Sequence, residues 1–141
     1  MSARALIVLT AIPFVVILVF LFVPYLSRQP WTPLRIAGAV IAIAGYSLVA
    51  TARVQLGKSF AVTPQAKELV THGFYSRIRN PMYVFVDVTI FGLILAVNLP
   101  WLLLFLVVWI GLQARQAGKE AEALQEKFGQ TYLEYRKQTW F

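Results

Sequence analysis

The stretch HGFYSRIRNPMY, residues 72–83, is the polar centre of a chain that is otherwise mostly hydrophobic. It gathers basic, aromatic and amide side chains directly before a hydrophobic run that starts at Met82. A second polar cluster, residues 115–120, follows where the last hydrophobic run ends. A hydrophobic hairpin between the clusters would return the chain to the same membrane face. We therefore expect the two clusters to close on each other and to build a cofactor pocket at the bilayer surface.

The composition indicates a membrane protein. Hydrophobic residues make up 59% of the 141 residues and charged residues 13%, whereas soluble domains have about 45–50% and about 25%. The sequence has no cysteine and one histidine, so we expect no disulfide, no thiolate catalysis and no metal site. The net charge of +7 is better explained by positive residues that flank membrane spans than by nucleic-acid binding. The length predicts a single domain over residues 1–141.

Hydrophobic runs predict four membrane helices. The first two, residues 5–26 and 34–56, are long enough to cross a hydrocarbon core of about 30 Å. Residues 5–26 are longer than a signal-peptide core and no cleavage site follows, so we expect a retained helix. A third helix over residues 82–97 would end at the break formed by Asn98 and Pro100, near which a fourth would begin.

The fourth helix is expected to continue beyond the membrane. From Arg115 onward, apolar residues recur at steps of three and four, which is typical of an amphipathic helix. Gly129 is a plausible stop or kink in it. The expected fold is therefore all-α and integral to the membrane, with four transmembrane helices and an amphipathic C-terminal helix that continues the fourth. The residues of the stripe are Ala117, Ala121, Leu124, Phe128, Tyr132 and Tyr135.

The distribution of basic residues predicts the orientation. Four spans would leave only Arg28 and Arg35, of 13 Lys and Arg residues, on one side of the membrane. Because cytoplasmic segments carry the excess of Lys and Arg, we expect both termini, the 57–81 loop and the C-terminal helix to be cytoplasmic. The expected location is a prokaryotic inner membrane.

Two motifs carry a resemblance to a known family. The segment G-x-Y-x-x-I-R-N-P-M-Y, from Gly73 to Tyr83, resembles the signature of the isoprenylcysteine carboxyl methyltransferases, a group that also includes phospholipid N-methyltransferases. The second half of that signature, E-x-x-x-L-x-x-x-F-G-x-x-Y-x-x-Y, runs from Glu120 to Tyr135. The resemblance covers about residues 70–137. The two halves in this order, around a hydrophobic hairpin, are more specific than either alone.

The resemblance implies an integral-membrane methyltransferase that uses S-adenosylmethionine. In that family the loop and the start of the third helix meet the cytoplasmic end of the fourth around the cofactor, and a lipid-like acceptor enters from the bilayer. The acceptor we expect first is a carboxylate of the isoprenylcysteine type; a phospholipid amine is the alternative. The sequence indicates no oligomeric state. The candidate cofactor-binding residues are His72, Gly73, Tyr75, Arg79, Asn80, Pro81, Tyr83 and Glu120.

Three residues are candidates for catalysis: Arg115, Glu120 and Asp87. Arg115 stands at the end of a hydrophobic run, where it can reach the membrane surface or hold an acceptor carboxylate by a two-pronged bond. Asp87 stands inside a predicted span, where a charge costs up to about 2.5–3.5 kcal/mol and therefore has a partner or a task. It would either pair with Arg53 or Arg77, or contact the substrate. For an amine acceptor, Asp87 or Glu120 is a candidate base.

The sequence departs from the family pattern at several positions. Asn80 stands where histidine is commonest, and Phe85 where glycine is frequent, which predicts a narrower pocket wall. Ala121 stands where a second glutamate usually follows the first, so that an acidic contact is missing or moved to Glu122. Arg115 is about one position from the arginine of some members.

These departures keep two other functions open. One is a membrane sterol-type reductase that binds NADPH, a class that shares the R-[HN]-P-x-Y stretch. Such reductases are longer and carry an acidic residue three positions after the tyrosine, whereas Asp87 follows Tyr83 by four. The other is a non-catalytic membrane protein that keeps the fold.

Overall fold

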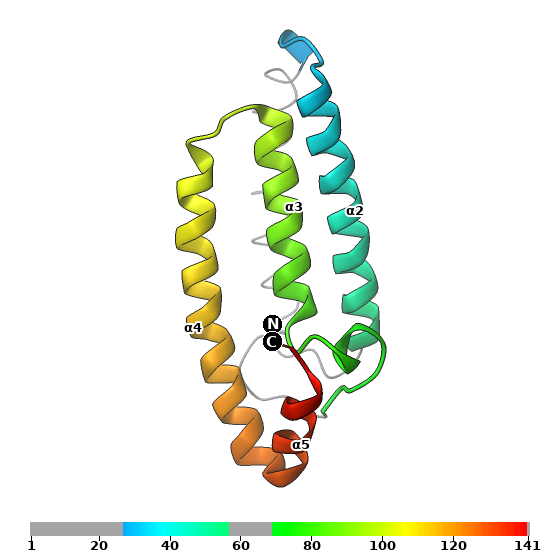
Figure 1. Cartoon of the computed structure of the whole chain (residues 1–141), viewed down its shortest axis with the longest axis vertical. Coiled ribbons are helices and arrows are strands. Elements are labelled where there is room, and N and C mark those ends of the chain that lie inside the picture. The colour runs from blue at the N-terminus through cyan, green and yellow to red at the C-terminus, as the bar shows by residue number, and fades with distance from the viewer. Residues whose placement is uncertain (1–26, 57–68, 141) are drawn as a thin grey trace, which may run out of the picture.

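The computed structural model describes residues 27–56 and 69–140, and all regular structure in these ranges is helical. Figure 1 shows α2, α3 and α4 side by side, with η2 and α5 at one end. The predicted first membrane helix, residues 5–26, lies outside the described residues. The bounds are α2 Pro33–Leu56, η2 Gly73–Ser76, α3 Pro81–Val97, α4 Leu102–Phe128 and α5 Gln130–Gln138.

Helices α2 and α3 approach closely because small residues line their contact. A Cβ atom added at Gly38 would lie 2.5 Å from the backbone nitrogen of Ala96, and one at Gly45 would lie 2.7 Å from Thr89 Oγ1. A Cβ at Gly92 would meet the backbone of Ala42. Small residues that let two helix backbones touch are typical of membrane helix pairs. These glycines therefore allow the backbones of α2 and α3 to touch.

Arg35 stabilises this helix pair at the end where α3 finishes. Its side chain is 2% exposed, and its Nε donates to the carbonyl oxygen of Ala96 in the last turn of α3 at 2.8 Å. Its Nη1 donates to the carbonyl of Pro30 at 2.8 Å, and its guanidinium lies over the Trp31 ring. The carbonyl end of a helix attracts a cation. Arg35 therefore turns inward and stabilises the end of α3.

The helical structure is interrupted between α3 and α4 where the sequence predicted. Asn98 adopts the left-handed conformation (φ 57°), and its N–H bonds back to the carbonyls of Ile94 and Leu95. Asparagine tolerates this conformation better than most residues, so it ends α3. Helix α4 begins at Leu102, two residues after Pro100 and near the predicted start.

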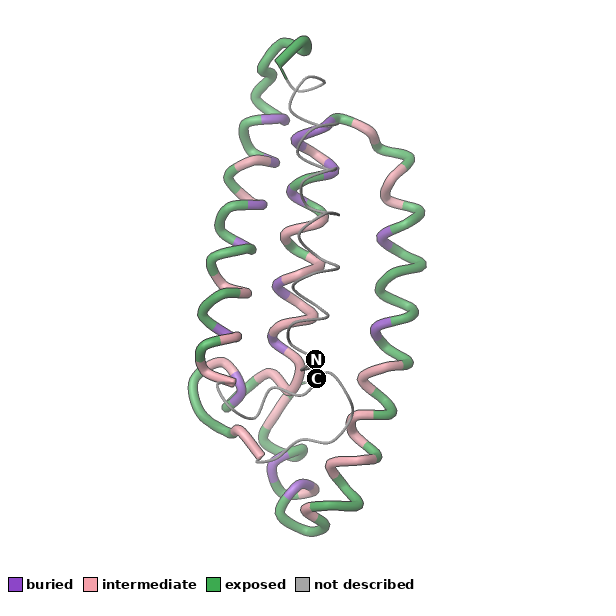
Figure 2. Tube along the Cα trace, turned by 180° about the vertical axis from the view of Figure 1, so that it is seen from behind, coloured by how far each residue is buried: buried purple, intermediate pink, exposed green. Residues whose placement is uncertain are grey.

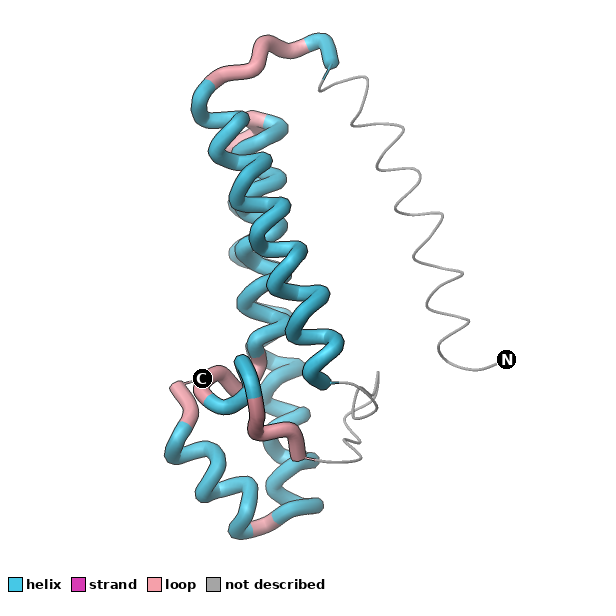
Figure 3. The backbone as a smooth tube through the Cα atoms, turned by 90° about the vertical axis from the view of Figure 1, so that its right-hand side faces the viewer, coloured by secondary structure: helices cyan, strands magenta, loops and turns pink. Residues whose placement is uncertain are grey.

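Helix α4 continues beyond its apolar part, as predicted, but only as far as Phe128. At Gly129 the backbone takes φ 52° and ψ −122°, a conformation that suits glycine. The chain then folds back as α5, so that the C-terminal segment returns to the residues that precede α3 (Figure 3). Gly129 was expected to stop or kink the helix, and in the structure the chain reverses its direction there.

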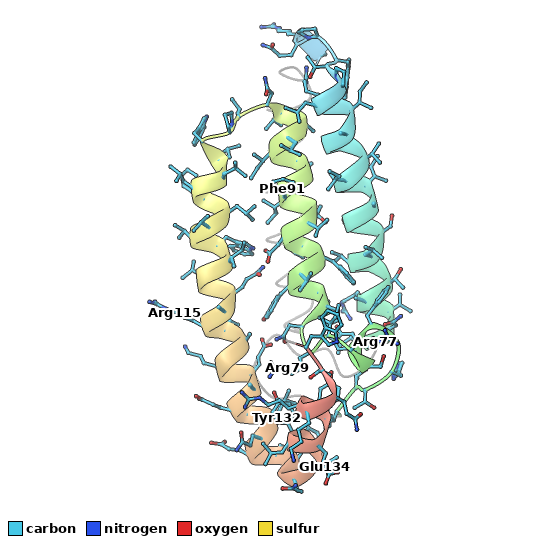
Figure 4. The ribbon with its side chains drawn as sticks, in the orientation of Figure 1. Arg77, Arg79, Phe91, Arg115, Tyr132 and Glu134 are labelled. Carbon is cyan, nitrogen blue, oxygen red and sulfur yellow. The ribbon has the colours of Figure 1, made fainter. Side chains whose placement is uncertain are left out.

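The described residues contain one helix, α2, that is long and apolar enough to cross a membrane. Helix α3 is apolar but has 17 residues, a length of about 25 Å. Most of the apolar half of α4 is exposed (Figure 2), including Leu104 and Val107. Arg35 lies at the end where α3 turns into α4, and Arg77 and Arg79 lie at the opposite end (Figure 4). Four spans and their orientation stay predictions.

Candidate functional site

A cavity of about 490 Å³ lies where α3, α4 and α5 meet. Its volume is in the range of about 300–1,000 Å³ that is usual for small-molecule sites. Four segments supply its wall: the residues before α3, the first two turns of α3, the middle of α4, and the C-terminal segment. The lining residues are Arg79, Asn80, Tyr83, Val84, Asp87, Ile110, Gln113, Ala114, Ala117, Gly118, Glu120, Ala121, Leu124, Tyr132, Tyr135, Arg136 and Trp140.

The start of α3 forms the first wall. Pro81 is the first residue of the helix and is buried, a position at which its missing N–H costs nothing. Asn80 precedes it with non-helical backbone (φ −124°, ψ 59°), and its side chain makes no capping hydrogen bond. Residues four apart share one face of a helix. Tyr83 and Asp87 accordingly both line the cavity, and the Asn80 amide joins them.

A hydrogen bond joins α3 to α4 across the cavity. The Tyr83 hydroxyl donates to Oε1 of Glu120 at 2.7 Å. Gln116 lies one turn earlier on α4 and donates through Nε2 to the same oxygen at 3.2 Å. Hydrogen bonds to a carboxylate are stronger than neutral ones. Two donors on one oxygen therefore fix the orientation of the Glu120 carboxylate.

The C-terminal segment is held against the residues that precede α3. The Tyr135 hydroxyl donates to the carbonyl of Tyr75 at 2.6 Å, and the backbone N–H of Trp140 donates to the carbonyl of Arg77 at 2.8 Å. Burial is the main cause that raises the pKa of both Tyr75 and Tyr135 to about 12. Both phenols are therefore neutral hydrogen-bonding groups at physiological pH.

Helix α2 supports this arrangement from outside the cavity. Tyr75 packs in a buried cluster with Ala52 and Phe85. The N–H of Phe74 donates to Oε1 of Gln55 at 2.8 Å. Gly73 has φ +60°, and a Cβ there would meet the Gln55 side chain, so both its conformation and its surroundings favour glycine. The glycine allows contact with α2.

Two buried polar atoms at the cavity have no hydrogen-bond partner among the described residues: Arg79 Nε and Asp87 Oδ1. A buried polar group without a partner is costly. One atom is a donor on a cation and the other an acceptor on an anion. Arg79 and Arg136 give the cavity two basic side chains, and Asp87 and Glu120 give it two acidic ones. This combination suits a ligand that carries charges of both signs.

Comparison with known protein families identifies the chain. A family model described as phospholipid methyltransferase matches residues 33–131, which is well over half of the 141 residues. The chain belongs to the phospholipid methyltransferase family. The resemblance of the two motifs to this group of membrane methyltransferases is thereby confirmed. A search of curated proteins gives no match.

Half of the site residues predicted from the sequence line the cavity. All of the predicted site residues fall within the described ranges. Those that line the cavity are Arg79, Asn80, Tyr83, Asp87 and Glu120; those outside it are His72, Gly73, Tyr75, Pro81 and Arg115.

The residues outside the cavity have other positions. His72 is exposed before η2, while Tyr75 and Pro81 are buried supports for the wall. Arg115 is exposed and projects from the outer side of α4, whereas Arg79 and Tyr132 lie on its inner side (Figure 4). The structure does not bring Arg115 together with the other candidates.

The departures from the family pattern have specific consequences. Phe85 comes two residues after Tyr83, which places it on the opposite side of α3, and its ring packs edge-on against Phe74 with centroids 5.0 Å apart. The expectation that it narrows the pocket is wrong. Ala121 lines the cavity, so a second carboxylate is missing there, and Glu122 is exposed.

Most of the lining residues that the sequence did not assign to the site belong to α4, and four come from α5 and its end. Tyr132 and Tyr135 were recognised as part of an apolar stripe and of the motif, but not as lining residues. Their spacing of three in Y-x-x-Y was the available signal, because it repeats on one helix face. Their position depends on the reversal at Gly129. The other unassigned residues include Gln113, Arg136 and Trp140.

Proposed function

We propose that this protein transfers a methyl group from S-adenosylmethionine to a lipid-like acceptor at the cytoplasmic face of a membrane. The observation that carries the proposal is the cavity itself. It is lined by residues from both halves of the family signature: Arg79, Asn80 and Tyr83 from the first, Glu120 from the second. Membership of the phospholipid methyltransferase family supports the reaction class.

The charges of the cavity fit the cofactor. S-adenosylmethionine has a carboxylate, an ammonium group, ribose hydroxyls and a sulfonium that supplies the methyl group. Arg79 offers a buried guanidinium nitrogen without a partner, which suits the carboxylate. Glu120, held by Tyr83 and Gln116, suits the hydroxyl or amino groups.

The contribution of the protein would be alignment. A methyl group moves by in-line displacement, which needs no nucleophile from the chain, and holding donor and acceptor in line lowers the barrier substantially. The Tyr83–Glu120 hydrogen bond joins the two helices between which both would bind. The apolar lining residues Ile110 and Leu124 would exclude water from part of the cavity once the ligands are bound. A drier site strengthens each electrostatic contact in it.

The acceptor is proposed to be lipid-like because the cavity lies beside apolar helix surfaces. Helix α4 exposes Leu104, Val107 and Val108 on the part that precedes the cavity residues. Such surfaces suit contact with acyl or prenyl chains. Two polar ends fit this description: the carboxylate of an isoprenylcysteine type and the amine of a phospholipid. A cytoplasmic cavity is expected because Arg77, Arg79 and Arg136 lie at its end of the protein.

Calorimetry in detergent tests the proposal. We expect S-adenosylhomocysteine to bind with one site per chain and NADPH not to bind. Radiolabelled methyl transfer should then be measured with a prenylcysteine and with phosphatidylethanolamine. Binding of NADPH alone would indicate a sterol-type reductase. If neither S-adenosylhomocysteine nor NADPH binds, this would indicate a non-catalytic membrane protein.

A further inference from the structure

We infer that a basic surface beside the C-terminal segment binds the headgroup of an anionic phospholipid. This basic surface is formed by the side chains of Arg77, Arg136, Lys137 and Trp140, all of which are exposed. Trp140 is 83% exposed, and together with Arg136 it also borders the cavity. The lipid would be a bound ligand and not a methyl acceptor, so the inference goes beyond the proposed function and does not depend on it.

A hydrogen bond brings the two parts of the basic surface together. Arg77 directly follows η2, whereas Arg136 and Lys137 lie in the last turn of α5. The backbone N–H of Trp140 donates to the carbonyl of Arg77 at 2.8 Å, so the end of α5 lies beside Arg77. The basic side chains therefore belong to one part of the surface, although they are far apart in the sequence.

Within the described residues, the basic surface has an excess of positive charge. The sequence has no Asp or Glu in residues 69–80 or 135–140. Helix α5 has one acidic residue, Glu134, which is exposed and lies nearer the tip of the molecule than Arg77 does (Figure 4). Glu120 in the cavity already accepts two hydrogen bonds. An excess of cations over carboxylates creates a positive potential that attracts an anion.

The contacts of the segment before α3 place this surface at one end of a membrane-length helix. Helix α2 is long and apolar enough to cross a membrane, and Gln55 lies in its last turn. The N–H of Phe74, three residues before Arg77, donates to Gln55 Oε1 at 2.8 Å. The apolar helix α3 begins at Pro81, four residues after Arg77. Arg77 and Trp140 therefore lie level with the ends of both helices, where the hydrocarbon of a bilayer would meet its headgroups.

A phospholipid headgroup with a net negative charge matches these groups. Arginine binds phosphate oxygens through two parallel N–H bonds, and lysine adds a point charge. Tryptophan is enriched where hydrocarbon meets headgroups, because its ring is apolar and its N–H is polar. Basic segments beside membrane helices attract the anionic lipids of the cytoplasmic leaflet, which is the side predicted for this end of the protein. A soluble anion would satisfy the cations but would not use the exposed indole of Trp140.

A headgroup bound here would connect two segments that supply walls of the cavity. Arg77 belongs to the segment before α3, and Lys137 belongs to α5. The Tyr135 hydroxyl already joins these segments through the carbonyl of Tyr75, and a phosphate between Arg77 and Lys137 would add a further connection. Bound lipid should therefore reduce opening of the C-terminal segment, which predicts slower amide exchange in residues 130–140.

Native mass spectrometry of the intact protein in detergent tests the inference, with phosphatidylglycerol and phosphatidylcholine of identical acyl chains. Both lipids contain a phosphate, but only phosphatidylglycerol has a net negative charge, and it has neither an amine nor a carboxylate to methylate. We expect phosphatidylglycerol to bind about tenfold more tightly, because several basic residues lie near the headgroup. The difference should shrink as the ionic strength rises, since the basic side chains are exposed. Amide exchange with each lipid then locates the site.

Two variants and one control complete the design. Arg77→Gln and Lys137→Gln should each lower the affinity for phosphatidylglycerol about fivefold and leave that for phosphatidylcholine within about twofold. The double variant should lose most of the preference. Lys127→Gln is the control, because it also removes one positive charge from the last turn of a helix, but at the tip of the molecule where α4 ends (Figure 1). It should leave the affinity for both lipids unchanged.

Equal affinity of the wild type for the two lipids would overturn the inference, even if the variants do not fold, and would leave an acidic protein segment as the alternative partner. A preference that survives in the double variant, or that falls equally in Lys127→Gln, would show that the basic surface is not the lipid site. Slower exchange elsewhere but not in residues 130–140 would show the same. These measurements need neither cofactor nor methyl acceptor, so a failure of the proposed function would not affect them.

Discussion

Toward α2, helix α3 presents Phe85, Thr89, Gly92 and Ala96, at helical steps of four, three and four, and the two backbones touch. Toward α4, the same helix presents Tyr83, Val84 and Asp87, and a cavity separates the two helices. One face of α3 is filled with small and aromatic side chains, and the other has polar groups around a space. A single helix thus serves both as a support and as a wall of the site.

This difference shows how a small membrane protein can keep a polar cavity in place. Arg35 closes the α2–α3 contact at one end, and the Tyr75 cluster closes it at the other. This contact fixes the position of α3. The cavity side depends on few connections, chiefly Tyr83 to Glu120 and Tyr135 to Tyr75. We expect substitutions on the first face to affect folding and those on the second to affect binding.

The largest effect is expected at the α2–α3 contact. Gly92→Leu would place a side chain against the backbone of Gly38 and Ala42, which flexible side chains cannot relieve. Overpacking costs about 1–3 kcal/mol and sometimes more. We expect much lower thermal stability in detergent, measured by the aggregation midpoint of the solubilised protein. Gly111→Ala is the control because a Cβ there meets nothing within 4 Å; equal stability of the two variants would contradict the close packing.

The next largest effect is expected at Glu120. Glu120→Gln removes the charge but keeps the shape, so a charged hydrogen bond to the cofactor worth about 1.5–3 kcal/mol would be weakened. We expect the affinity for S-adenosylhomocysteine to fall about 10- to 100-fold. Tyr83→Phe removes only the bond that orients Glu120, and a smaller loss of affinity should follow. Glu122→Gln, on the exposed side, serves as the control, and a loss of equal size there would contradict the assignment.

A smaller effect is expected from Tyr135→Phe. The hydroxyl donates to the buried carbonyl of Tyr75, and its loss should cost about 1 kcal/mol of stability. The pKa of both phenols is raised from 10 to about 12 in the folded protein. The unfolded chain therefore ionises first, and stability should fall as the pH rises from 10 to 12. Melting temperatures across this pH range should fall less steeply in Tyr135→Phe than in the wild type.

The smallest effect is expected at Arg115. Its exposed position on the outer side of α4 predicts that Arg115→Lys leaves S-adenosylhomocysteine affinity within about twofold. Arg79→Lys is the matched change inside the cavity, where loss of the planar guanidinium should weaken binding. A larger loss of affinity in the Arg115 variant than in the Arg79 variant would reverse the two assignments.

The sequence predicted much of the fold because local signals mark its element ends. Pro33 begins α2, Pro81 begins α3, and the break at Asn98 ends it, each within two residues of the expected position. The sequence also predicted five of the residues that line the cavity, four from the two motifs and Asp87 from its charge inside a predicted span. These features depend on chemistry that acts over a few neighbouring residues, such as proline geometry and hydrophobic periodicity.

Other features depend on contacts between segments that are distant in the sequence. Local signals did not predict the inward position of Arg35, because the carbonyl that accepts its hydrogen bond belongs to Ala96, 61 positions away. The helix period alone did not reveal that Phe85 faces α2, because the position of α2 was not known from sequence. The reversal at Gly129, which brings Tyr135 to Tyr75, depends on the same kind of contact.

Hydrogen–deuterium exchange of the wild-type protein in detergent, with and without S-adenosylhomocysteine, tests the location of the cofactor site most directly. We predict slower amide exchange on binding in residues 72–83 and 113–140, and no change in residues 38–50 of α2. This pattern would place the cofactor in the cavity between α3, α4 and α5. If S-adenosylhomocysteine binds but amide exchange in residues 72–83 and 113–140 does not slow, the cofactor site does not lie in this cavity.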